Sequence, residues 1–349
     1  MLFFDNSACV NCERVVGFSE IERAVVGVDG DPNGNQPLID ASGRQLWRCA
    51  NWRDFGVCNR LVSADVSDGN TLCLACGLNR TVPDQSVEGN DERWAKLEAA
   101  KRRMLYDLEL IGWPMDVPDP DQGSAPPLVF KFMADAMPED GHWVPMADGE
   151  PVYTGHADGV ITVNLKEADD LERERMRLNL GEPQRSLIGH FRHEVGHYFW
   201  DRFFKHNDAA RRRCVAVFGD HEDPSYSDAM ERHYKEGAPD DWRERYVSAY
   251  ATMHPWEDWA ESWSLYLEAY GTMDTLSAHN MATWPEDAAG SGFGDLLTRY
   301  LKQAVALNEL ARNRGMTLMH PEAVSTPVLE KLRFMNEVVQ GSRRAGQPS

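Results

Sequence analysis

Two histidines four residues apart, with a glutamate directly after the first, constrain this chain more than any other feature of its sequence. Residues 193–197 read His-Glu-Val-Gly-His. On an α-helix, His193 and His197 project to the same side, where both imidazoles can bind one Zn²⁺. Glu194 can then act as the general base on a zinc-activated water. Five-residue patterns also arise by chance, so the surrounding sequence has to support this interpretation.

The sequence around the motif predicts one amphipathic helix over residues 184–206, with Pro183 just before it. Its broad apolar face contains Leu187, Ile188, Phe191, Val195, Tyr198, Phe199 and Arg202. Its polar face contains His190, His193, Glu194, His197 and Asp201. Because the motif lies wholly on the polar side of a helix whose other side is suited to burial, the pattern favours a metal site over a surface helix with structural histidines.

A catalytic zinc site needs a third protein ligand and one open position for water. Some zinc peptidases take this ligand from a histidine that follows the motif and a glycine, but here Trp200 and Phe203 occupy those two positions. Asp201 lies on the motif's own helix. Three ligands on consecutive turns of one straight helix would strain a tetrahedral site, so we expect Asp201 at most to orient a ligand.

A better third ligand lies on a second predicted helix, which begins at Pro255. Glu257 and Glu261 are four residues apart, so their carboxylates share one face, where like charges repel unless a cation lies between them. We predict Glu257 as the third ligand. We predict that Glu261 accepts a hydrogen bond from the free ring nitrogen of a ligand histidine. The alternative is two solvated acids at a helix N-terminus, where the helix dipole favours them.

Three further polar residues near the two helices have candidate roles. Tyr250, seven residues before Glu257, is suited to hydrogen bonding the oxyanion of a tetrahedral intermediate. A partly buried structural tyrosine is an equally good interpretation. We expect His254 to cap a helix or lie in a loop, and His190 to line the cleft without binding metal.

Six of the seven cysteines lie in the first quarter of the chain and predict a structural zinc site. No apolar run resembles a signal peptide or a membrane span. We therefore expect a cytoplasmic chain whose cysteines bind zinc rather than form disulfides. We favour a Cys₄ site of Cys49, Cys58, Cys73 and Cys76. A site built from the Cys73 and Cys76 pair with the Cys9 and Cys12 pair is the alternative.

Charge argues against a nucleic-acid partner. The formal net charge is −20, and residues 1–90 alone contain 7 Lys or Arg against 12 Asp or Glu. A nucleic-acid interface needs the opposite sign. The expected partner is therefore a peptide or protein substrate.

The sequence resembles a family of bacterial proteins that couple an N-terminal zinc ribbon to a zinc-binding metallopeptidase domain. The resemblance covers nearly the whole chain and rests on residues 154–164, 167–170, 189–198, 218–220 and 250–261. It implies a further Cys-x-x-Cys pair just upstream of Cys9. This chain begins inside that pattern, so Cys9 and Cys12 are expected to form an incomplete site. Residues 250–261 also resemble the gluzincin peptidases of the lethal-factor type, which implies Tyr250 at the oxyanion and Glu257 on zinc.

Together these features predict an α+β protein with a zinc-ribbon domain over residues 1–85 and a mainly helical, zincin-like domain with a small sheet over residues 90–338. A disordered tail is expected over residues 339–349. Within the second domain we expect a helix over residues 91–111 and strands near residues 128–133 and 159–165. We interpret the last of these as an edge strand that pairs with an extended substrate, with an ordinary sheet strand as the alternative.

The function we predict is that of a zinc metallopeptidase with one catalytic and one structural zinc. The rival is a non-catalytic zinc-binding scaffold whose ribbon recognises a partner. A structural metal site is usually closed by four protein ligands, so a fourth ligand from Asp201 or His190 would favour the rival.

Overall fold

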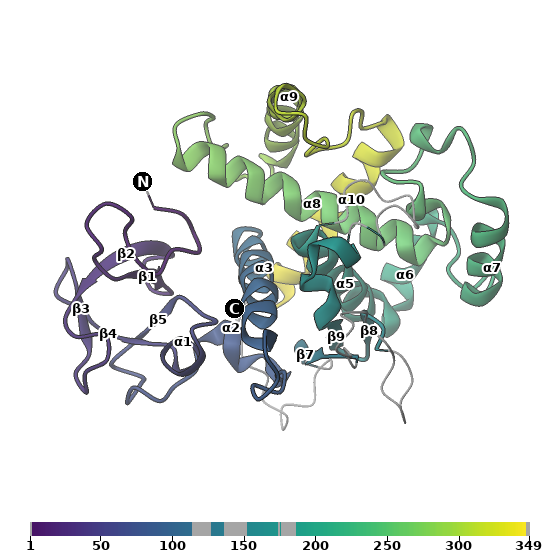
Figure 1. Ribbon diagram of the computed structural model, residues 1–349. Coiled ribbons are helices and arrows are strands. Elements are labelled where there is room, and N and C mark those ends of the chain that lie inside the picture. The colour runs from purple at the N-terminus through teal and green to yellow at the C-terminus, as the bar shows by residue number, and fades with distance from the viewer. Residues whose placement is uncertain (1, 114–126, 136–151, 174, 176–185, 347–349) are drawn as a thin grey trace.

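The computed structural model describes residues 2–113, 127–135, 152–173, 175 and 186–346. It is an α+β structure with an N-terminal, cysteine-containing β region and a mainly helical second part with a small sheet, as the sequence predicts. Figure 1 shows the N-terminal region, in purple, on one side of helix α3 (Asn90–Leu110) and much of the remaining helical part, in teal and green, on the other side. No helix in the described ranges is long and apolar enough to cross a membrane.

The N-terminal region is a small closed barrel of five strands in the order β1-β2-β3-β4-β5. These strands are β1 (Val16–Ser19), β2 (Ala24–Asp29), β3 (Leu38–Asp40), β4 (Gln45–Arg48) and β5 (Arg60–Ser63). The barrel closes where β1 pairs in parallel with β5. Short helices α1 (Ala50–Phe55) and α2 (Leu74–Gly77) carry or flank the clustered cysteines.

The second sheet has four strands in the order β6-β7-β9-β8. They are β6 (Asn79–Thr81), β7 (Val129–Met133), β8 (Gly155–Ala157) and β9 (Val160–Asn164). Strand β6 begins only three residues after Cys76, yet it pairs in parallel with β7 of this sheet. The cysteine region and the helical part are therefore joined by a shared sheet.

The interpretation of residues 159–165 as an edge strand is wrong. Strand β9 pairs in parallel with β7 and antiparallel with β8, so both of its edges are occupied. Asp158 and Gly159, both with positive φ, form the tight turn that folds β8 back onto β9. Asp-Gly is a typical two-residue hairpin turn, because it tolerates positive φ at both positions. Within the described ranges, β6 and β8 lie at the edges of this sheet.

The helical part begins with α3, which corresponds to the helix predicted over residues 91–111. The helices that follow β9 are α5 (Leu187–Trp200), α6 (Asp208–Phe218), α7 (Tyr226–Glu236), α8 (Pro255–Ala278), α9 (Phe293–Asn313) and α10 (Thr326–Gly346). The motif helix is shorter than predicted, because a π-helical turn over Asp201–Lys205 follows α5. The start of the predicted helix, residues 184–185, lies outside the described residues. Helix α10 continues to Gly346 and so extends into the stretch over which the sequence predicts a disordered tail.

Candidate active site

Helix α5 carries the His-Glu-Val-Gly-His motif and is anchored by its apolar face. Ser186 caps the helix by accepting a hydrogen bond from the Gly189 amide at 3.1 Å. Phe191, Val195 and Phe199 are buried against the sheet and neighbouring helices. Because the helix is fixed on this side, the histidines on its other side are held in one orientation.

Helix α8 packs closely against α5 at the motif's glycine. A Cβ at Gly196 would lie 3.0 Å from the Ala260 backbone and 3.1 Å from the Trp263 side chain. The Trp259 indole N–H donates to the Gly196 carbonyl at 2.9 Å. A side chain at this position would crowd α8, so the glycine favours the close approach that brings the first turns of α8 beside the two histidines.

His193, His197 and Glu257 converge on one point between these helices. Glu257 Oε2 lies 3.0 Å from His193 Nε2 and 3.5 Å from His197 Nε2, and the two Nε2 atoms are 3.1 Å apart. Zinc bonds of about 2.0–2.1 Å at tetrahedral angles would separate the ligand atoms by about 3.3 Å. The three side chains thus fit a zinc ion. No fourth His, Cys, Asp or Glu joins them in the described parts of the chain.

The electrostatics of this group also favour a cation at its centre. Burial acts to raise the pKa of Glu257, but the neighbouring imidazoles of His197 and His193 outweigh burial and hold that pKa well below its usual value. Burial acts to lower the pKa of His193, while Glu257 and Glu261 raise it well above its usual value. The carboxylates of Glu257 and Glu261 are therefore stabilised by positive charge at this point, and a zinc ion would supply it.

Glu261 lies where the sequence predicts it, beside a ligand histidine. Its Oε1 is 2.6 Å from His193 Nδ1, and its Oε2 accepts a hydrogen bond from the Ser248 hydroxyl at 2.6 Å. A carboxylate on Nδ1 keeps the proton on that nitrogen, so Nε2 faces the metal position as a free lone pair.

His197 is oriented differently. The Trp256 ring lies against its imidazole with a centroid separation of 3.7 Å, and its Nδ1 has no hydrogen-bond partner in the described structure. Asp201, expected at most to orient a ligand, instead pairs with Lys205 at 3.2 Å. Asp201 keeps α-helical backbone angles and donates its amide to the His197 carbonyl, so its carboxylate keeps the expected register but is paired with Lys205.

Tyr226, the first residue of α7, was not identified from the sequence. Its hydroxyl donates to Glu257 Oε1 at 2.9 Å and is hydrogen-bonded to the Tyr250 side chain. The Tyr250 ring lies 6.1 Å from the His193 ring, so both tyrosines border the metal position. Tyr226 precedes Glu257 by 31 residues with no helical or strand periodicity connecting them, so no sequence spacing could have indicated this contact.

Two further histidines lie near the candidate site. His254 caps α8 by accepting a hydrogen bond from the Trp256 amide at 3.1 Å. His190 Nδ1 lies 3.1 Å from Glu167 Oε2, and both residues line a small cavity that also borders Glu194. Neither His190 nor Asp201 closes the group as a fourth ligand.

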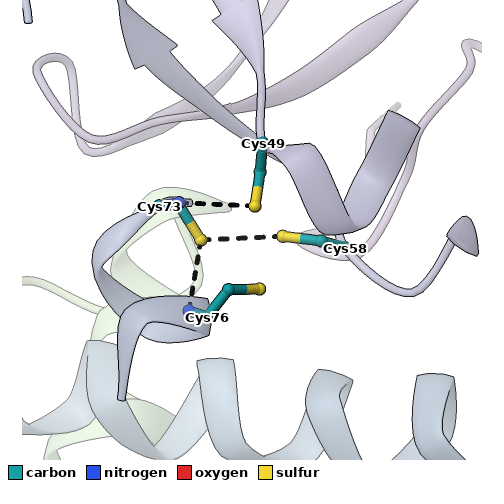
Figure 2. A group of neighbouring side chains, drawn as sticks. All are labelled: Cys49, Cys58, Cys73 and Cys76. Carbon is teal, nitrogen blue, oxygen red and sulfur yellow. Dashed lines mark hydrogen bonds between the residues drawn. The ribbon is translucent and has the colours of Figure 1, made fainter. Parts of the chain in front are cut away.

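Four buried cysteines form a second cluster, shown in Figure 2. They are Cys49, Cys58, Cys73 and Cys76, the grouping that the sequence favours. The Sγ atoms of Cys58 and Cys73 are 3.7 Å apart, close to the separation of about 3.8 Å that zinc–sulfur bonds of about 2.3 Å produce at tetrahedral angles. Backbone amides of Arg60, Cys73 and Cys76 donate to sulfur atoms of the cluster.

The Cys9 and Cys12 pair is not part of that cluster. Cys12 is exposed and Cys9 is half-buried. Backbone hydrogen bonds from Asn11 and Cys12 lower the pKa of Cys9. Among the described residues, no third metal-ligating side chain joins this pair. The alternative grouping of the two Cys-x-x-Cys pairs is therefore wrong.

The folded chain thus combines a buried Cys₄ cluster with a helical domain that carries a three-ligand His-His-Glu group, and both suit zinc. Comparison with known protein families also indicates zinc-binding domains in both parts of the chain. Residues 90–338 match the family described as "Putative zinc-binding metallo-peptidase", and residues 1–87 match a zinc-ribbon domain. The chain belongs to this metallopeptidase family.

Similar full-length proteins exist in mycobacteria. Uncharacterized proteins of Mycobacterium bovis and of Mycobacterium tuberculosis strains H37Rv and CDC 1551 are each 36% identical over 345 residues. Each alignment covers 97% of this chain and 92% of the relative. No solved structure gives a significant match.

The distances predict different effects for the two glutamates of α8. Glu257→Ala removes one of the three candidate ligands, and we expect that variant not to hold zinc at this site. Glu261→Ala leaves all three ligands but releases His193 Nδ1, and we expect zinc affinity to fall by about 10–100-fold. Zinc counted per chain after gel filtration, with a chelator titration for affinity, measures both. Asp201→Ala is the matched control and should retain zinc. Loss of zinc from Glu261→Ala but not from Glu257→Ala would reverse the assignment.

Proposed function

We propose that this chain is a zinc-dependent peptidase, with His193, His197 and Glu257 as ligands of the catalytic zinc. A zinc ion bound there supplies a Lewis acid for the scissile carbonyl and lowers the pKa of water. Glu194 takes the proton from the attacking water and delivers it to the leaving amine. Tyr250 donates a hydrogen bond to the oxyanion that develops on the carbonyl. The Cys₄ cluster holds a second, structural zinc.

One observation carries this proposal over the scaffold alternative. The His-His-Glu group offers three ligand atoms at tetrahedral spacing, and in the part of the chain that the structure describes no fourth side chain closes it. Structural zinc sites are usually closed by four protein ligands, whereas catalytic sites keep a position open for water and substrate. The buried Cys₄ cluster follows the first pattern, and the His-His-Glu group follows the second.

We further propose that β8, rather than β9, pairs with the substrate backbone. Among the strands that the structure describes, β8 is an edge strand, and it lies beside helix α5, since the His156 ring is 6.2 Å from the Tyr198 ring. An edge strand offers unpaired backbone amide and carbonyl groups to an extended peptide, which gives affinity with little dependence on its sequence.

A metal-dependence experiment tests the proposed function. The purified full chain should contain two zinc ions and should cleave an unstructured protein such as fluorescein-labelled casein. Treatment with 1,10-phenanthroline should stop cleavage, and added zinc should restore it, whereas magnesium should not. A chain that carries both zinc ions yet leaves casein and a diverse peptide library intact would contradict the proposal.

The role of Tyr250 predicts a specific kinetic effect. Tyr250→Phe removes the hydroxyl but keeps the ring, so we expect kcat to fall by about 10²–10³-fold with both zinc ions retained. Kinetics on one fluorogenic peptide, with zinc counted in the same samples, measure this. Tyr226→Phe is the comparison variant, because that hydroxyl already bonds a ligand carboxylate. A large loss of kcat in Tyr226→Phe alone would assign the oxyanion role to the other tyrosine.

A further inference from the structure

Helix α7 carries a row of exposed apolar side chains along one face. Tyr226, Met230 and Tyr234 follow each other at intervals of four residues, which places them on one side of the helix. They are 38%, 38% and 64% exposed, whereas Ala229 is the only buried residue of α7. The helix lies at the outer edge of the molecule in Figure 1. We call these three residues the α7 stripe.

The α7 stripe begins at the candidate zinc site. The Tyr226 hydroxyl contacts Glu257, and the Tyr226 ring lies 5.7 Å from the Trp256 ring, which in turn lies against His197. Two turns further along α7, the His233 ring lies 6.0 Å from the Tyr250 ring. The helix therefore runs beside the candidate site over two turns.

The surface around the α7 stripe is strongly acidic. Residues 219–241 contain eight Asp or Glu residues against two Lys or Arg, and all eight acidic residues are exposed. This short segment thus has a formal charge of −6 (two basic minus eight acidic residues), out of −20 for the whole chain. An apolar face rimmed by negative charge attracts a ligand that is both apolar and basic, because long-range attraction and apolar burial then act together.

We propose that the α7 stripe is the substrate-binding surface beside the proposed catalytic zinc, and that it selects extended peptides with bulky apolar side chains next to basic ones. The proposal deepens the peptidase function and rests on it for the identity of the ligand as a substrate. The apolar side chains of the peptide lie on Met230 and Tyr234, and its basic side chains face the surrounding carboxylates. Preference for apolar residues then comes from α7, while backbone pairing comes from the sheet edge.

Binding by an inactivated protein tests the surface separately from catalysis. The probes are three fluorescein-labelled 12-residue peptides, one alternating Leu and Arg, one Leu and Glu, and one Ser and Arg. Zinc-loaded full-length Glu194→Gln protein is titrated against each by fluorescence anisotropy. We expect the Leu/Arg peptide to bind at least about tenfold more tightly than either of the others, since only it offers both apolar burial and positive charge.

The variants locate the contact. In the Glu194→Gln background, M230S/Y234S should weaken Leu/Arg binding about tenfold, as expected when two apolar contacts are lost. The matched control is V305S/L310S on α9, where Val305 and Leu310 are 64% and 56% exposed and distant in sequence from the site. All four residues are exposed, so unfolding temperatures should stay unchanged.

Each outcome has a defined consequence. Equal binding of the three peptides, binding of none, or unchanged Leu/Arg binding by M230S/Y234S overturns the inference, and so does an equal loss in the α9 control. If the expected binding pattern holds but the unmutated zinc-loaded chain cleaves no peptide, the peptidase function fails while the peptide-binding surface stands. If the chain cleaves casein but the binding pattern is absent, only the assignment of the α7 stripe fails.

Discussion

Glu194→Gln is expected to abolish peptide hydrolysis while the protein keeps two zinc ions per chain. Glutamine has nearly the same shape as glutamate but cannot accept the proton of the attacking water. General-base catalysis contributes about 10²–10⁴-fold to the rate, so we expect kcat/KM to fall by at least about 10²-fold. Glu194 is separate from the three ligand side chains, so the zinc site should remain intact.

The measurement is kcat/KM on a fluorogenic peptide, with zinc counted in the same preparation. Glu309→Gln is a matched control, because Glu309 is an exposed residue of α9 that pairs only at the surface with Arg312. The control should keep full activity. Unchanged turnover in Glu194→Gln would refute the mechanism, and loss of zinc from this variant would show that Glu194 acts in metal binding instead.

Cys73→Ser is expected to remove the structural zinc and to destabilise both parts of the chain. Structural zinc in small modules contributes an apparent free energy of about 10–16 kcal/mol, much of which is folding free energy. The Cys73 thiol is fully buried between Cys49, Cys58 and Cys76, and a serine there would leave three cysteines unable to close a tetrahedral site.

The loss of stability in Cys73→Ser should extend beyond the barrel, because the cysteine cluster is connected to the helical part by strand pairing and hydrogen bonds. Strand β6 follows the cysteine turn directly and pairs with β7. Helix α3 reaches back to the same region, where Lys101 Nζ donates to the Ala75 carbonyl at 2.8 Å and Arg102 Nη1 donates to the Val57 carbonyl at 2.7 Å. We therefore expect faster amide exchange in β6 and β7, as well as in the barrel.

Zinc counting, thermal unfolding and hydrogen exchange together measure this prediction. Zinc should fall from two ions to one per chain, and the unfolding temperature should fall. Cys214→Ser is the matched control, because Cys214 is buried but outside the cluster, and burial raises its pKa to about 12. It should retain both zinc ions. A Cys73→Ser protein that still holds two zinc ions would exclude this cluster as a structural site.

The sequence predicts most of the candidate site because its parts lie on regular helices. Helical spacing places His193 and His197 on one face of a helix, and the same rule pairs Glu257 with Glu261. The structure brings His193, His197 and Glu257 together across the α5–α8 contact. The structure also brings together Cys49, Cys58, Cys73 and Cys76, the group of four cysteines that the sequence favours.

The incorrect predictions concern features that no local pattern encodes. The place of β9 inside its sheet depends on pairing with β7, from a distant segment, and on the β8 hairpin. The helical end of the chain, which continues to Gly346, has a sequence that locally favours disorder. For β9, pairing with β7 and β8 overrides the local alternation that suggested an edge strand.

By itself, the sequence determined the class of this protein. Ligand types and helical periodicity are local properties, so they can be recognised without knowing how the helices pack. Only the tertiary structure decided which groups surround the metal position. Tyr226 reaches Glu257 because α7 lies beside α8, and Gly196 permits α5 and α8 to approach closely enough for three ligand atoms to meet. Contacts between distant segments depend on how the helices pack together, and periodicity within one segment carries no information about that packing.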